Sequence, residues 1–115
     1  MPAFADLLEK EEIAATIEYV LTLSKQEHDQ TLVPIGAELF ADNCSSCHGD
    51  AGLGDPDMGA PNLADAIWLY GGNRDALSYT IENARFGVMP AWGQRLSEED
   101  VRAVSAYVYA LGGGE

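Results

Sequence analysis

The sequence is poor in basic residues and has no long apolar run, and each absence excludes a class of function. Only six Lys and Arg residues accompany 19 Asp and Glu residues, so the formal net charge of −13 argues against binding to nucleic acids or to anionic membrane surfaces. No segment approaches the roughly 18 consecutive apolar residues that a membrane-spanning helix needs. The N-terminus is acidic and lacks the apolar core of a signal peptide, so we expect an exported form to be a mature protein or part of a longer chain.

The alternation of apolar and polar residues that marks a half-buried β-strand is also missing, which predicts an all-α fold. The clearest helix begins after Ser97, a good N-cap residue, and ends at Gly112. Apolar residues at helical spacing predict three further helices, at about 8–23, 35–43 and 75–85. Gly87 is expected to stop the last of these. The segment 49–73 is rich in turn-forming residues and has at most a short helical turn near 64–69.

An internal repeat divides the chain. Residues 1–23 (MPAFADLLEKEEIAATIEYVLTL) and 89–111 (MPAWGQRLSEEDVRAVSAYVYAL) align without a gap, and nine of the 23 positions are identical. We interpret residues 31–115 as one complete domain and residues 1–30 as a helix and linker that remain from a preceding unit of the same kind. Because the original domain of that helix is absent, we expect the helix to be held only loosely against the rest.

Both cysteines and one of the two histidines lie in one short motif, NCSSCHGD. A redox-active dithiol of the thioredoxin type accompanies a βαβ pattern, which this sequence lacks. A zinc site needs four ligands, so Cys44, Cys47 and His48 would have to be joined by His28 from a polar linker. His48 also follows Cys47 directly, which places it poorly for the same tetrahedron.

Covalent haem attachment explains more of this motif. In a Cys-x-x-Cys-His sequence the two thiols, here Cys44 and Cys47, add to the two vinyl groups of the porphyrin. The following histidine, here His48, is then positioned to ligate the iron. The motif therefore favours haem over a dithiol or zinc.

A methionine supplies the sixth ligand in this interpretation. Met89 lies 41 residues after His48, and Pro90 stiffens the loop that would hold its sulfur. A thioether ligand stabilises the ferrous state and raises the reduction potential. Two other methionines compete: Met58 lies in a polar glycine loop, and Met1 matches Met89 in the repeat and could replace it if the two Met-Pro loops were exchanged.

A bound haem also requires groups that contact its propionates and its ring. Arg85, in NARFGVMP, is the best candidate to pair with a propionate, although an arginine there would also complement a helix dipole. Trp68 and Tyr70 are candidates for the pocket wall or for propionate contacts, with simple packing as the alternative. Trp92 is expected to close the pocket.

These features together resemble a class I cytochrome c domain, over residues 34–115. Gly36 and Phe40 match the glycine and the aromatic residue of that family's N-terminal helix, which crosses the C-terminal helix at an aromatic, here Tyr107. Pro61, in GAPNL, matches the proline whose carbonyl accepts the imidazole N–H of the proximal histidine. The resemblance implies a class I cytochrome c fold with an extra N-terminal helix.

The stretches GAPNLADAIWLYGG and NARFGVMPAWGQRL most resemble the second haem domain of the dihaem subunit of cbb-type cytochrome c oxidases. That subunit carries two cytochrome c domains in tandem behind a membrane anchor. The resemblance implies one covalently attached haem c with low-spin iron bound by His48 and Met89, because the first domain's motif is missing. It implies an electron carrier of a respiratory chain, without an active site of its own, that exchanges electrons with other c-type cytochromes and the oxidase catalytic subunit. We expect a periplasmic location, with membrane association through other parts of a parent chain.

Three alternatives remain open at this point. One is a free-standing soluble periplasmic monohaem cytochrome c that shuttles between complexes. Another is a haem enzyme or gas sensor, which would need an open sixth coordination position. The third is a metal-binding or redox module without haem.

Overall fold

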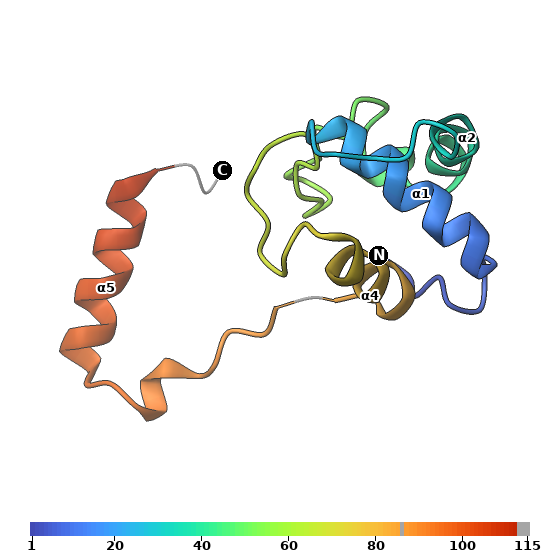
Figure 1. Cartoon of the computed structure of the whole chain (residues 1–115). Coiled ribbons are helices and arrows are strands. Elements are labelled where there is room, and N and C mark those ends of the chain that lie inside the picture. Colours follow the sequence, from blue (N-terminus) through green and yellow to red (C-terminus); the bar gives the residue numbers. More distant parts are fainter. Residues whose placement is uncertain (86, 113–115) are drawn as a thin grey trace. The chain divides into compact units, whose positions relative to one another are not determined.

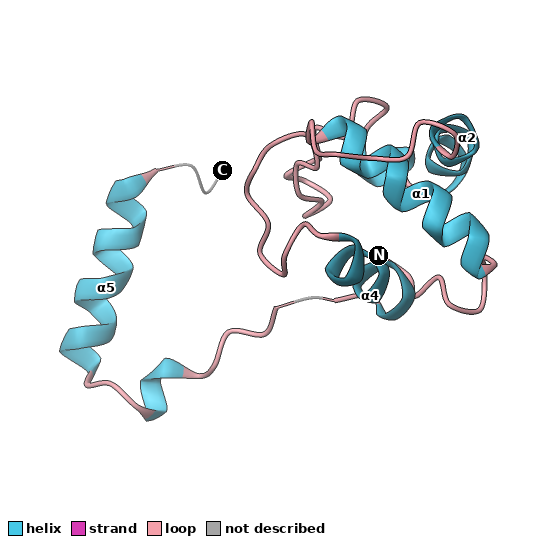
Figure 2. Cartoon of the chain, in the orientation of Figure 1, coloured by secondary structure: helices cyan, strands magenta, loops and turns pink. Residues whose placement is uncertain are grey.

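The protein is helical in the computed structural model, which describes residues 1–85 and 87–112 (Figures 1 and 2). Its elements in chain order are α1 (Lys10–Leu23), α2 (Val33–Asn43), α3 (Ser45–His48), α4 (Arg74–Asn83), the 3-10 turn η1 (Trp92–Gln94) and α5 (Glu98–Leu111). Among the described residues the only β-type pairing is an isolated bridge between Asp55 and Ala60, so the predicted all-α fold is confirmed. The chain forms two compact units, residues 1–85 and residues 86–115.

All four predicted helices form, with ends that differ from the predicted ones by up to two residues, and the stop assigned to Gly87 is wrong. The helix α4 ends at Asn83 rather than at Gly87, because Ala84 adopts a left-handed conformation with φ of 53°. At its N-terminus the side chain of Asn73 accepts a hydrogen bond from the N–H of Ala76 at 2.8 Å, as an N-cap should. The region near 64–69 contains bends and no helical turn.

The second unit contains α5, which begins after Ser97 and ends at Gly112, as the sequence predicts. The Ser97 hydroxyl accepts a hydrogen bond from the Asp100 N–H at 3.1 Å, and Gly112 ends the helix with φ of 70°. Within its own unit α5 contacts η1, and none of its side chains is buried there. The apolar side chains of this helix are therefore not buried by contacts within its own unit.

The core of the first unit is built mainly by α1. Its apolar stripe packs against one residue from α2 and one from α4, and the buried cluster consists of Ile13, Ile17, Val20, Leu21, Phe40 and Leu77. Burying each such side chain contributes roughly 1.5–3 kcal/mol. The expectation of a loosely held N-terminal helix is therefore wrong, because the amphipathic stripe of α1 finds matching apolar faces on α2 and α4. The predicted division into residues 1–30 and 31–115 rests on the internal repeat and stays a prediction.

The helices α1 and α2 approach each other closely at Gly36. A Cβ atom added to Gly36 would lie 2.7 Å from the carbonyl carbon of Ala15 and 2.9 Å from the Cβ of Tyr19. One turn further along α2, the ring of Phe40 lies 5.1 Å from the ring of Tyr19. The sequence predicts Tyr107 as the partner of this glycine and aromatic pair. In the first unit this contact is made by Tyr19, the counterpart of Tyr107 in the repeat, and the crossing with Tyr107 stays a prediction.

The segment before α1 is fixed to the end of α4. Phe4 is buried, and its N–H donates a hydrogen bond to the carbonyl of Ile81 at 3.0 Å. The next residue, Ala5, donates to the carbonyl of Glu82 at 3.4 Å. The residues that precede α1 in the first copy of the repeat are thus part of the packed unit.

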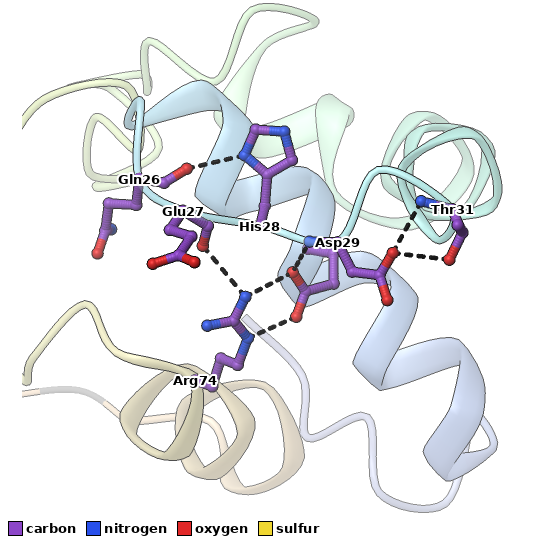
Figure 3. Close-up of polar contacts among 7 residues, drawn as sticks. Gln26, Glu27, His28, Asp29, Thr31 and Arg74 are labelled. Atoms are coloured by element: carbon purple, nitrogen blue, oxygen red, sulfur yellow. Dashed lines mark hydrogen bonds and ion pairs between the residues drawn. The ribbon is translucent and has the colours of Figure 1, made fainter.

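A polar cluster joins α1, the following linker and α4 (Figure 3). The Arg74 guanidinium donates to both carboxylate oxygens of Glu18, from Nε at 2.6 Å and from Nη2 at 2.9 Å. The same carboxylate accepts the Asp29 N–H at 2.7 Å, and Arg74 also donates to the Glu27 carbonyl at 3.1 Å. The Glu18 side chain is only 8% exposed, whereas that of Arg74 is 52% exposed.

These contacts lower the pKa of two carboxyl groups. The hydrogen bonds from Arg74 lower the pKa of Glu18, although burial acts in the opposite direction. The pKa of Asp29 is lowered because the Thr31 hydroxyl and N–H both donate to its carboxylate. Both side chains are therefore held as carboxylates near neutral pH.

Adding one methyl group at the α1–α2 crossing should destabilise the first unit. We expect Gly36→Ala to lower the free energy of unfolding by about 1–3 kcal/mol, because the backbone of α1 leaves no room for a Cβ. Chemical denaturation of the 115-residue chain measures this. The matched control is Gly93→Ala, where an added Cβ meets no atom within 4 Å. Equal effects of the two changes would contradict the crossing described.

The Glu18 carboxylate should contribute stability that depends on pH. Because its folded pKa lies below the ordinary value of 4.5, the contribution is present above that pH and is lost as the pH falls through the folded pKa. We expect Glu18→Gln to lower the free energy of unfolding at pH 7 by about 1–2 kcal/mol, since the half-exposed Arg74 is screened by solvent.

Urea denaturation at a series of pH values tests this expectation. The difference between the two proteins should shrink below pH 4.5 as the native carboxylate becomes protonated. Glu98→Gln is the control, because it removes the carboxylate of an exposed ion pair with Arg102 and should change stability less. A difference that persists unchanged in acid would count against the Glu18 ion pair.

Candidate functional site

The Cys-x-x-Cys-His motif forms a single helical turn that follows directly from α2. Cys44 ends α2, and its N–H donates to the Phe40 carbonyl at 2.8 Å. The Cys44 carbonyl then accepts the N–H groups of Cys47 at 3.2 Å and His48 at 3.0 Å. Positions three and four residues apart lie on one face of a helix, so both thiols and the imidazole project from the same turn. Both cysteines are free and half-buried.

The pKa of the Cys44 thiol argues against an active dithiol. Burial, with a smaller effect of the neighbouring Cys47, raises the pKa of Cys44 to about 11. Redox-active cysteines of Cys-x-x-Cys motifs have lowered pKa values instead, because the thiolate is the reactive form. Cys44 is therefore held as a neutral thiol, which is unfavourable for disulfide exchange.

Zinc binding is also unsupported by the geometry. Within residues 1–85 and 87–112, no three His, Cys, Asp or Glu side chains converge as they would around a metal ion. His28, the one remaining histidine, is engaged in its own loop, where its ring nitrogens contact the Gln26 carbonyl at 2.8 Å and the Gln30 amide at 2.6 Å. Of the three hypotheses, the two thiols and the imidazole on one turn best match covalent attachment of a haem.

The imidazole of His48 is oriented by the hydrogen bond that the sequence predicts. Its Nδ1 lies 3.0 Å from the carbonyl oxygen of Pro61. A carbonyl can only accept, so Nδ1 carries the proton and Nε2 keeps its lone pair. His48 can therefore act as a neutral nitrogen ligand through Nε2.

The loop that presents Pro61 is folded back against the motif by a network of backbone hydrogen bonds. The Gly54 N–H donates to the His48 carbonyl at 2.8 Å, and Asp55 and Ala60 exchange two hydrogen bonds of 2.9 Å. Gly54 has φ of +80°, and an added Cβ would lie 2.5 Å from the Ala60 oxygen and 2.7 Å from the Pro61 carbonyl carbon. The role of Gly54 was not predicted, although the glycine-rich stretch AGLGD indicates a turn there.

The predicted haem contacts Arg85 and Tyr70 lie together. The Arg85 guanidinium lies 5.3 Å from the Tyr70 ring and 4.3 Å from that of Tyr79, and it donates to the Tyr70 carbonyl at 3.4 Å. Trp68 packs on the core cluster, and an added Cβ on Gly72 would lie 2.6 Å from its indole. The contact of Tyr79 with Arg85 was not predicted. The roles of Arg85, Tyr70 and Trp68 toward a haem stay predictions.

The three candidate methionine ligands lie in different segments. Met89 belongs to the second unit, three residues before η1, and Trp92 follows in that turn with Arg95 5.4 Å from its ring. Met1 begins the segment that is fixed to α4. Met58 lies in the loop closed by Asp55, whose carboxylate accepts the Met58 N–H at 3.4 Å. The assignment of Met89 as iron ligand stays a prediction.

In the part of the chain that the structure describes, no helix has the length and apolar character needed to cross a membrane.

Comparison with known proteins identifies close relatives. The family model described as cytochrome c oxidase, cbb3-type, subunit III matches residues 32–108. The chain is 56% identical over 117 residues to the cbb3-type cytochrome c oxidase subunit CcoP of Cereibacter sphaeroides. It is 47% identical over 124 residues to the CcoP of Rhodobacter capsulatus, and 47% identical over 116 residues to the subunit FixP of Azorhizobium caulinodans. Each alignment covers the whole chain but only 40–42% of the relative, so the chain spans about two fifths of their length.

Filling the space beside Gly54 should disturb the orientation of His48. We expect Gly54→Ala to lower the free energy of unfolding by about 2–4 kcal/mol, because the positive φ and the contact with the Pro61 carbonyl both oppose a side chain. The fraction of His48 in the Nδ1–H form, measured by nitrogen NMR of the haem-free chain, should fall as well.

Gly59→Ala is the matched control for this change. Gly59 also has a positive φ, of +65°, but no atom lies within 4 Å of an added Cβ. It should cost only about 1 kcal/mol and leave the His48 tautomer unchanged. A tautomer shift in both variants, or in neither, would show that the Pro61 loop does not orient the imidazole through Gly54.

Proposed function

This chain belongs to the family of cbb3-type cytochrome c oxidase subunit III, and we propose that it is an electron-transfer domain that carries one covalently attached haem c. The resemblance to the haem-bearing subunit of cbb-type oxidases is thereby confirmed. The observation that carries the functional proposal is the single turn that holds Cys44, Cys47 and His48, with His48 fixed through Nδ1 to the Pro61 carbonyl. This set of groups fits a haem c, which needs two thiols and one neutral imidazole nitrogen.

The haem c would supply one-electron chemistry, by cycling its iron between Fe(III) and Fe(II). Cys44 and Cys47 would each form one thioether bond to it, and His48 would ligate the iron through Nε2. The hydrogen bond from Nδ1 to Pro61 fixes the ring orientation and raises the basicity of the ligating nitrogen. Met89 would be the second axial ligand and would favour the ferrous state.

The remaining site residues would hold and shield the cofactor. Arg85 lies beside Tyr70 at the end of α4, and we assign its guanidinium to a propionate. Trp68 and Tyr70 would contribute to the wall of the pocket. No residue is assigned to substrate chemistry, because an electron carrier needs only to bind the haem, set its potential and expose an edge of it to a partner.

The partners and the location are inferred from the relatives, which are named as subunits of cbb3-type oxidases. We assign the chain to the periplasmic side of a respiratory membrane, where it would pass electrons from other c-type cytochromes towards the oxidase catalytic subunit. Membrane association would come from other parts of a parent chain. The net charge of −13 would steer it to a partner with a basic surface. The names of the relatives favour this assignment over a free-standing shuttle cytochrome.

Production of the chain in a host that exports it and attaches c-type haem tests this proposal. We expect one haem per chain, still bound after denaturation in acidified organic solvent, and no bound haem when Cys44 and Cys47 are both replaced by alanine. Met89→Ala should abolish the methionine-to-iron charge-transfer band of the oxidised protein. It should also lower the reduction potential, on the order of 10² mV, because axial ligands set potentials over roughly 0.8 V.

Met1→Ala is the control for the axial ligand, because it replaces the methionine that matches Met89 in the repeat. This variant should keep both the charge-transfer band and the potential. Loss of the band in Met1→Ala alone would show that Met1, rather than Met89, ligates the iron. A chain that acquires no covalent haem despite intact maturation would overturn the proposed function.

A further inference from the structure

The guanidinium of Arg85 is held by two aromatic rings and a backbone carbonyl instead of a carboxylate. Its central carbon lies 4.3 Å from the centre of the Tyr79 ring and 5.3 Å from that of the Tyr70 ring. Its Nη1 donates a hydrogen bond to the Tyr70 carbonyl at 3.4 Å, the only one that this guanidinium makes in the part of the chain that the structure describes. Arg74 and Arg102, by contrast, each pair with a glutamate. Among the described residues the charge of Arg85 is therefore not neutralised by a carboxylate.

The way in which α4 begins and ends produces this arrangement. Tyr79 belongs to α4 and lies six positions before Arg85. Ala84 ends the helix in a left-handed conformation, so the chain leaves the helix axis and the Arg85 side chain returns to the Tyr79 ring. Tyr70 precedes Asn73, the N-cap of α4, in the sequence. Arg85 thus contacts both the segment that enters α4 and the helix itself.

Aromatic contacts restrain a guanidinium without occupying its hydrogen-bond donors. A ring attracts the positive charge, whereas the five N–H donors of an arginine lie in one plane and bind acceptors such as carboxylates. The Tyr70 carbonyl takes up one of these donors on Arg85. Arg85 is therefore both restrained and able to bind a carboxylate with its other donors, which is the arrangement that a propionate requires.

We propose that Tyr79 is a positioning residue, which holds the Arg85 guanidinium where it pairs with a haem propionate and thereby raises the reduction potential. This inference rests on the proposed function, in which Arg85 has that role. Tyr79 is 53% exposed and lies outside the buried core, so its ring contributes the contact with Arg85 rather than core packing. A fixed positive charge near the haem favours Fe(II), because Fe(III) carries one more positive charge.

Reduction potentials of the haem-loaded 115-residue chain test this role. Arg85→Gln should lower the potential, because it removes a positive charge near the haem. Tyr79→Leu should lower it by a smaller amount, and Tyr79→Phe should leave it unchanged because the ring is kept. In an Arg85→Gln background Tyr79→Leu should have no further effect, since Tyr79 acts through Arg85. Arg102→Gln is the control, because it removes an exposed arginine of α5, and it should change the potential less than Arg85→Gln does.

The mobility of the Arg85 side chain gives a second measurement that needs no haem. In the haem-free 115-residue chain, nitrogen NMR relaxation reports the order parameter of the Arg85 Nε–H bond. Tyr79→Leu should lower this order parameter towards the flexible range, below about 0.6, whereas Tyr79→Phe should preserve it.

The two measurements distinguish failure of this inference from failure of the proposed function. The positioning role is overturned if Tyr79→Leu leaves either the potential or the order parameter unchanged, or if it still lowers the potential in the Arg85→Gln background. Covalent haem content is measured in the same samples. A chain without covalent haem overturns the proposed function, and the assignment of Arg85 to a propionate with it. Full haem content with unaltered potentials overturns the role of Tyr79 alone.

Discussion

The close crossing of α1 and α2 at Gly36 is the contact on which the first unit depends. Removing the side chain at one position lets the two backbones approach, and this brings Tyr19 onto Phe40 and the apolar stripe of α1 onto the core. Without this stripe the unit would keep only Phe40 and Leu77 of its buried cluster. A domain this small cannot lose such a fraction of its apolar burial and remain stable.

The geometry of the candidate site depends on that core. Phe40 is buried against α1, and its carbonyl accepts the hydrogen bond that ends α2 at Cys44. The next turn presents the second thiol and His48, and the loop around Gly54 returns to place the Pro61 carbonyl on the imidazole. Cys44, Cys47 and His48 are thus held by contacts within a single packed unit, which gives the imidazole one orientation.

Local signals were sufficient for much of this protein. The helices followed from apolar periodicity and end residues such as Ser97, and the His48–Pro61 contact followed from a family resemblance that the motif introduced. The features that were not predicted depend mainly on contacts between residues far apart in the sequence. Nothing local shows that Ala84 would end α4 by adopting a positive φ, or that Glu18 would pair with Arg74, 56 positions away. The packing of α1 on Gly36 was not predicted, because the resemblance assigned this contact to Tyr107, which Tyr19 matches in the internal repeat.

The position of Gly36 means that a tilt of α2 at its crossing with α1 displaces the other end of the helix. Gly36 lies near the start of the helix and Cys44 lies eight residues later, a distance of about 12 Å along the axis. A tilt of roughly 10° about the crossing would therefore displace the end of α2 by about 2 Å. Gly36 sets the distance between the two helices at the crossing, so small changes in helix packing there become larger displacements of the end of α2 that carries Cys44.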